Sequence, residues 1–117
     1  MIIVNMMGGT GNQMFQYALG RKLSVLLNKP LKLELNFLKS DHGPDHTYWD
    51  YSMDMFNINA ETIDKYEKTE NTLILKENSE CNLITGLFDA IKQYSNYDIY
   101  VDGYFQKNPY ISDFKNV

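Results

Sequence analysis

The sequence predicts an α/β fold built on a parallel sheet, and three features near the N-terminus carry that prediction. A short β-branched run, Ile2-Ile3-Val4, leads into a cluster of glycines. Apolar residues then recur at helical spacing over residues 12–27, and a strictly alternating segment follows at residues 31–35. A strand, a helix and a strand in this order favour a parallel pair joined by a right-handed crossover.

The first strand is expected over residues 2–7, because the apolar run is short and ends at glycine. The following helix is expected to have Asn12 as its N-cap and to end at Lys29-Pro30, since proline disfavours helical geometry in the residue before it. Its expected core face is apolar and consists of Phe15, Leu19, Leu23 and Leu26. A second face carries small and polar residues, which are Gln16, Gly20, Ser24 and Asn28.

The rest of the chain continues the α/β pattern. Two more strands are predicted at residues 72–76 and 98–103, the second of them ending at a glycine. Helices are predicted at residues 60–68, 83–94 and 109–116. The alternation of strands and helices is typical of a sheet that continues to add parallel strands.

Residues 36–53 lack clear periodicity and are predicted to form a long loop. Loops of this length in compact domains are often functional. Within it, the segment Asp41-His42-Gly43-Pro44-Asp45-His46 brings two imidazoles and two carboxylates together, which is a combination of metal-ligand types. The same residues are ordinary in exposed turns, so no metal site is predicted.

The bulk properties restrict the class of protein. The chain of 117 residues, 44% hydrophobic and 22% charged, is typical of one globular domain. Its net charge is −4 and its eleven Lys and Arg residues are scattered, so nucleic acid is not an expected partner. Cys81 is the single cysteine, which excludes an internal disulfide and indicates a reducing compartment. No signal peptide and no run of roughly 18 apolar residues is recognisable, so a cytoplasmic location is expected.

The glycine cluster Gly8-Gly9-Thr10-Gly11 between the first strand and the first helix predicts a ligand site. Such a turn places backbone N–H groups and a helix N-terminus at the carboxyl edge of a sheet, where anions and phosphates bind. A P-loop is excluded, because Asn12-Gln13 stand where Lys-Ser/Thr are required. A dinucleotide fingerprint fits in its first two glycines and in the acid Glu34, but Met14 is too bulky for its third small position.

The segment GGTGNQMFQYALGRKL, residues 8–23, resembles the N-terminal signature of the glycosyltransferase family 11 fucosyltransferases. These are α-1,2-fucosyltransferases, and their usual signature has leucine at the position of Thr10. Further segments are similar to the family in the same order: residues 31–35, residues 51–58 (YSMDMFNI), residues 103–106 (GYFQ) and Tyr110.

This resemblance implies a GT-B architecture, in which two Rossmann-like domains flank the active site. It implies transfer of L-fucose from GDP-fucose to the 2-hydroxyl of a galactose-containing glycan, with inversion and without a metal or other cofactor. Residues 1–117 would then form a single Rossmann-like domain that is incomplete relative to the family. The second, donor-binding domain and its His-x-Arg-x-Gly-Asp segment are absent from this chain. The chain alone is therefore expected to be inactive and to need a second domain or chain, with at most a peripheral membrane contact through the glycan acceptor.

The resemblance also implies which residues bind the donor or substrate. These are Gly8, Gly9, Thr10, Gly11, Asn12, Gln13, Gln16, Tyr104 and Gln106. Asn12 is the foremost of them, because its amide can donate to a diphosphate or sugar oxygen beside a helix N-terminus.

An inverting transfer also needs a base on the acceptor hydroxyl. The candidate catalytic carboxylates are Glu34, Asp50 and Asp102, and the sequence does not choose among them. The pair Tyr48-Trp49 either forms an acceptor platform or covers the sheet. The alternative function is a noncatalytic glycan- or nucleotide-binding module derived from such an enzyme. A structural fragment that binds no ligand is a third hypothesis.

Overall fold

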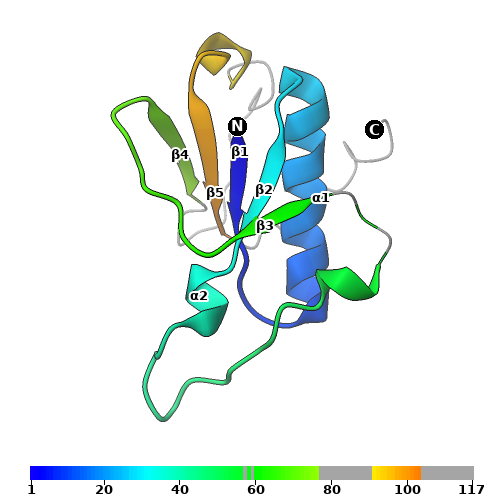
Figure 1. The fold of residues 1–117 in the computed structure, drawn as a ribbon, viewed down its shortest axis with the longest axis vertical. Coiled ribbons are helices and arrows are strands. Elements are labelled where there is room, and N and C mark those ends of the chain that lie inside the picture. Colours follow the sequence, from blue (N-terminus) through cyan, green and yellow to red (C-terminus); the bar gives the residue numbers. More distant parts are fainter. Residues whose placement is uncertain (57, 59, 77–90, 104–117) are drawn as a thin grey trace.

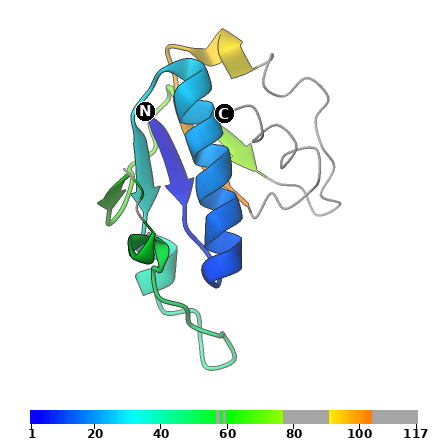
Figure 2. The ribbon, with the colours of Figure 1, turned by 90° about the vertical axis from the view of Figure 1, so that its right-hand side faces the viewer.

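The computed structural model describes residues 1–56, 58, 60–76 and 91–103, which form a five-stranded parallel sheet with a long helix along one face (Figures 1 and 2). The α/β fold predicted from the sequence is therefore confirmed. In chain order the elements are β1 (Ile2–Asn5), α1 (Thr10–Leu27), β2 (Leu31–Glu34), α2 (Asn36–Lys39), the 3₁₀ turn η1 (Met53–Met55), β3 (Glu61–Ile63), β4 (Thr72–Lys76), the 3₁₀ turn η2 (Lys92–Tyr94) and β5 (Asp98–Asp102).

The strand order is β3-β2-β1-β5-β4, and all neighbouring strands are parallel. In the central strand, Ile2 lies opposite Leu31 of β2 on one side and Ile99 of β5 on the other. β4 comes before β5 in the chain, yet β5 lies beside β1 and β4 lies at the outer edge. In the dinucleotide-binding order 3-2-1-4-5-6, the earlier of two such strands lies beside β1. Because β2 and β5 lie on opposite sides of β1, the carboxyl ends of β1 and β5 form a switch point, the place where α/β sheets bind ligands.

The core lies between α1 and the sheet face that α1 covers. Alternate strand residues point to this face because the side-chain period of a strand is two. The buried strand residues of this core are Ile2, Val4, Leu31, Leu33, Ile99 and Val101. Leu19 and Leu23 of α1 complete the layer with no exposed surface. Full burial of such an aliphatic side chain contributes about 1.5–3 kcal/mol, so this layer is the main source of stability.

The buried face of α1 differs from the expected one. Its buried residues are Gln13, Gln16, Leu19, Gly20, Leu23 and Ser24, whereas Phe15 and Leu26 are only partly buried. The stripe of small and polar residues faces inward because Gly20 brings the helix close to the sheet. A Cβ atom at Gly20 would lie 3.0 Å from Leu31 Cδ1 and overlap Val4 Cγ2.

The ends of α1 also differ from the expectation. The helix begins at Thr10 with Gly9 as its N-cap, so the assignment of Asn12 as the N-cap is wrong. The helix ends before Lys29-Pro30, because Asn28 takes a left-handed conformation with φ of 52°. A residue in this conformation is a common helix stop, and a proline often follows it.

Two further expectations are corrected. Residues 60–68 are not a helix, because Glu61–Ile63 form the edge strand β3, for which the β-branched Thr62 and Ile63 are well suited. The predicted loop 36–53 opens with the short helix α2, and only its remainder is irregular up to η1. The strand at 72–76 is confirmed and that at 98–103 is confirmed over Asp98–Asp102. Of the predicted helix 83–94 only the 3₁₀ turn η2 and Ile91 lie within the described residues, and residues 109–116 lie outside them.

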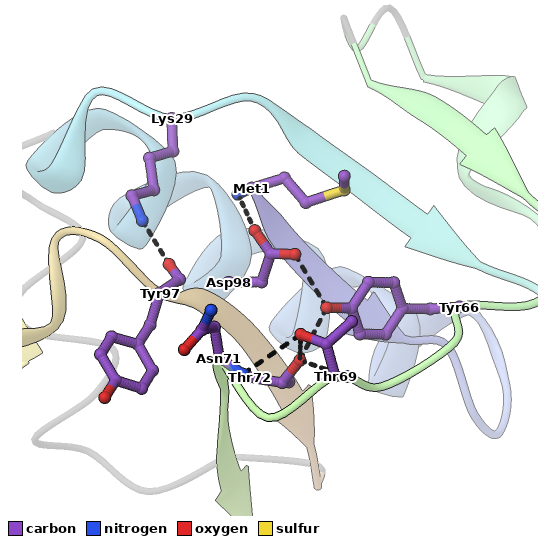
Figure 3. Close-up of polar contacts among 8 residues, drawn as sticks. All are labelled: Met1, Lys29, Tyr66, Thr69, Asn71, Thr72, Tyr97 and Asp98. Carbon is purple, nitrogen blue, oxygen red and sulfur yellow. Dashed lines mark hydrogen bonds and ion pairs between the residues drawn. The ribbon is translucent and has the colours of Figure 1, made fainter.

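Residues 64–71 link β3 at one edge of the sheet to β4 at the other, and Tyr66 anchors this connection to the face opposite α1. Its main-chain N–H donates to Glu34 Oε2 at 2.6 Å, and its ring stacks on Tyr100 with centroids 5.8 Å apart. Its hydroxyl donates to Asp98 Oδ2 at 2.8 Å (Figure 3). The amino group of Met1 lies 2.6 Å from the other Asp98 oxygen. Burial alone would raise the pKa of Asp98, but these two donors outweigh it and hold the pKa below its usual value.

No helix in the described part of the chain has the length and apolarity that crossing a membrane requires.

Two glycines of α1 give opposite predictions for the free energy of unfolding. Gly20→Ala should lower it by about 1–3 kcal/mol, because the methyl group overpacks the contact with Val4. Gly11→Ala should leave it unchanged or raise it by up to about 1 kcal/mol, because a Cβ there meets open space and alanine favours helix. Urea unfolding followed by circular dichroism measures both, and equal effects of the two variants would contradict this packing.

Candidate functional site

The glycine turn, Met6 to Gly11, connects the carboxyl end of β1 to α1, and its backbone conformation requires glycine at one position. Gly8 has a φ of 75°, a conformation that residues with a side chain rarely adopt. A Cβ atom there would also lie 2.6 Å from the side-chain nitrogen of Asn12. The turn therefore reverses the chain tightly and brings Asn12 over Gly8.

Gln16 fixes the start of the turn from inside the protein. Its side chain has no exposed surface. Its Oε1 accepts a hydrogen bond from the N–H of Met7 at 2.9 Å, and its Nε2 donates to the carbonyl of Met7 at 3.0 Å. The side-chain amide thus pairs with the backbone as a neighbouring strand would, which satisfies polar groups that are costly to bury unpaired.

Gln13 connects the same turn to a segment far along the chain. Its Nε2 donates to the carbonyls of Gly8 and Asp50, both at 2.9 Å. Its Oε1 accepts from the N–H of Ser52 at 3.0 Å and from the Ser52 hydroxyl at 3.3 Å. Thr10 adds a hydroxyl contact to Ser52 at 3.0 Å. These contacts make the glycine turn and residues 50–52 one unit.

The N-terminus of α1 lies in this turn without a capping side chain among the described residues. The first intrahelical bond runs from the N–H of Gln13 to the carbonyl of Gly9, at 3.0 Å. The first turn also contains no acidic residue. The positive end of the helix dipole is therefore not balanced by a carboxylate of its own first turn, which favours an anion there.

The aromatic loop, residues 40–49, is organised by its own hydrogen bonds. The Tyr48 hydroxyl donates to Asp41 Oδ1 at 2.8 Å, and the N–H of Gly43 donates to the same oxygen at 3.0 Å. The hydrogen bond from Gly43, together with that from Tyr48, holds the pKa of Asp41 below its usual value. The N–H of His42 in turn donates to the Tyr48 hydroxyl at 2.9 Å.

A pocket of about 220 Å³ opens between the glycine turn, α2 and the aromatic loop. Its lining residues are Gly8, Asn12, Phe37, Leu38, His46, Thr47, Tyr48 and Trp49. The Trp49 ring lies over Gly9, since a Cβ atom at Gly9 would meet that ring at 3.4 Å. Tyr48 and Trp49 remain about half exposed, at 51% and 50%. The pocket thus combines aromatic walls with an amide, a hydroxyl and an imidazole.

The three candidate carboxylates have different surroundings. Glu34 is 3% exposed, and its two oxygens accept from the N–H of Tyr66 and the hydroxyl of Tyr100. Burial, and then the hydrogen bond to Glu34, raises the pKa of Tyr100. Asp102, at the end of β5, accepts from Asn5 Nδ2 at 3.2 Å. Asp50 is exposed, and its carbonyl is the group that Gln13 holds.

The structure places the predicted residues Gly8 to Gly11 in the turn, with Asn12 just after it in α1, where it lines the pocket. It places Gln13 and Gln16 beneath the turn, where they bind backbone groups. Tyr104 and Gln106 lie outside the described residues. Sequence reasoning missed Phe37, for which there was no signal, and His46, which was considered only as a metal ligand.

Neither a metal cluster nor a related protein identifies the function of this site. Among the described residues, no three His, Cys, Asp or Glu side chains gather closely enough to hold a metal ion. Comparison with protein-family models, curated proteins and solved structures finds no match for the chain.

The Gln13 contacts predict a specific effect of Gln13→Glu. The carboxylate cannot donate to the carbonyls of Gly8 and Asp50, and an unpaired buried polar group costs about 1–3 kcal/mol. We expect lower stability together with a changed emission of Trp49, the only tryptophan, because the neighbouring residues 50–52 lose their attachment. Gln16→Glu is the matched control, since it should reduce stability without changing that emission. Unchanged Trp49 emission in folded Gln13→Glu would contradict the account.

Proposed function

We propose that the chain is the N-terminal part of a GDP-fucose-dependent inverting fucosyltransferase of the GT-B type, similar to galactoside α-1,2-fucosyltransferases. The observation that carries the proposal is the position of the glycine turn. The segment that bears the resemblance lies at the carboxyl edge of a parallel sheet and shares a pocket with the aromatic loop. In α/β sheets, ligands bind at this edge.

The helix N-terminus supports the donor part of the proposal. A departing GDP develops negative charge on its diphosphate oxygen, and prearranged N–H donors stabilise such charge. The first turn of α1 offers backbone N–H groups and no competing acid. Asn12 adds a side-chain amide at the same place, where it lines the pocket.

The small size of the pocket supports the proposal that this chain supplies only part of the ligand site. Pockets for drug-sized ligands measure about 300–1,000 Å³. The pocket of about 220 Å³ accommodates one ring rather than a whole sugar nucleotide. The donor beyond its diphosphate would contact a second domain or chain, so the chain alone has little or no transferase activity.

A noncatalytic glycan- or nucleotide-binding module is the second candidate. It is favoured by one observation, namely the aromatic lining of the pocket, because Phe37, Tyr48 and Trp49 offer apolar surface on which a sugar ring can pack. The glycan-binding form of this module differs from the proposed transferase part in what it binds, because it has no need of GDP.

Calorimetric titration of the chain with GDP and with GDP-fucose tests the proposal. We expect both to bind, and Asn12→Ala to weaken binding by about tenfold or more, since a hydrogen bond to a charged group contributes about 1.5–3 kcal/mol. Asn71→Ala is the matched control, because Asn71 is exposed at the opposite end of the sheet. Absence of GDP binding by the folded chain contradicts the proposal, and glycan binding without GDP binding would favour the noncatalytic module.

A further inference from the structure

We propose that His46 is the base that accepts the proton of the acceptor hydroxyl, from a single sugar ring seated in the pocket. This inference rests on the proposed function and adds to it a group that is none of the three candidate carboxylates. It follows from three observations: the hydrogen bonds and ring contacts of the two histidines, the surroundings of the carboxylates and the composition of the pocket.

The two histidines of the chain occupy different environments within the same loop. His42 Nε2 lies 2.8 Å from the carbonyl of Phe37 and must carry a hydrogen, because a carbonyl only accepts. The His46 ring is held by ring contacts, with its centroid 4.5 Å from that of His42 and 4.9 Å from that of Tyr48. Within the described residues its ring nitrogens make no hydrogen bond, and the residue lines the pocket. His46 is therefore held in orientation while a ring nitrogen remains available.

The carboxylates are less suitable bases. Glu34 is buried and both of its oxygens accept hydrogen bonds, and Asp102 is bonded to Asn5. Asp50 is exposed and is not among the residues that line the pocket. A general base needs a lone pair within hydrogen-bond reach of the proton that it takes, and a neutral imidazole in the pocket offers one.

The pocket composition indicates a sugar ring as the occupant. Phe37, Tyr48 and Trp49 line the pocket and offer apolar surface, against which the C–H groups of a pyranose can pack. Thr47 and His46 supply polar groups for its hydroxyls. A volume of about 220 Å³ suits one such ring. The acceptor sugar thus lies next to the glycine turn, where the donor diphosphate is proposed to bind.

The proton balance of the transfer gives His46 its role. The acceptor hydroxyl oxygen forms a bond to C1 of fucose, and the bond from C1 to the diphosphate oxygen breaks with its electron pair going to GDP. The hydroxyl proton passes to the unprotonated ring nitrogen of His46, which becomes an imidazolium. Protonated His46 cannot accept this proton, so transfer requires the neutral imidazole.

His42 is the natural control for His46. The two rings lie in the same loop with their centroids 4.5 Å apart, but only His46 lines the pocket. A sugar in the pocket should therefore affect His46 more than His42.

The test is titration of the 117-residue chain with methyl β-D-galactopyranoside, followed by NMR of the imidazole nitrogens. We expect the His46 ring nitrogens to shift and saturate while those of His42 change less. His46→Phe should weaken sugar binding by about fivefold or more, because it removes the ring nitrogen that accepts from the acceptor hydroxyl. His42→Phe is the matched control and should weaken binding less, since His42 is not among the residues that line the pocket.

Three outcomes would overturn the inference. The first is a folded wild-type chain in which the sugar shifts neither imidazole. The second is a folded His46→Phe variant that binds the sugar as tightly as the wild-type chain. The third is His46-dependent sugar binding in a chain that binds no GDP, because the transferase proposal then falls and the base role with it. If the chain binds GDP but the sugar does not shift the His46 ring nitrogens, this inference fails and the proposed function is kept.

Discussion

The site depends on two buried side-chain amides that bind backbone groups. Gln16 pairs with both main-chain polar groups of Met7, and Gln13 joins Gly8 to residues 50–52. A glycine-rich connection is by itself conformationally free, because glycine loses more entropy on folding than any other residue. The two amides supply the contacts that offset this cost. Among the described residues, no buried side-chain polar atom is left without a partner.

The amino end of the sheet has a structural role, and the carboxyl end forms the candidate site. At the amino end, Tyr66, Asp98 and the amino group of Met1 hold the connection that crosses the sheet (Figure 3). At the carboxyl end, the glycine turn and the aromatic loop form the pocket. Since the stabilising core lies between, substitutions in the pocket need not disturb the sheet. A rigid parallel sheet that positions loops at its carboxyl edge is the usual basis of ligand sites in α/β proteins.

Sequence patterns predicted the sheet better than the site. The strand-helix-strand unit and the strands β4 and β5 were visible as local periodicity, which depends on few long-range contacts. Periodicity placed Gln16 and Gly20 away from the core, because it counts apolar residues and does not recognise an amide that pairs with the backbone. The edge strand β3 was missed because a three-residue strand depends on its neighbour more than on its own sequence. Phe37 lines the pocket from α2, and His46 lines it from the aromatic loop. The path of the chain that brings both residues to the glycine turn is not encoded in any local pattern.

Hydrogen exchange of two main-chain amides tests the central claim most directly, namely that the glycine turn and residues 50–52 form one preorganised unit. The N–H groups of Met7 and Ser52 are outside regular structure, yet each donates to a buried glutamine oxygen. The account predicts that both exchange much more slowly than the exposed amides of the aromatic loop, because opening either bond requires release of the glutamine. Exchange of Ser52 as fast as that of those exposed amides would show that the two segments are not joined, and would contradict the account.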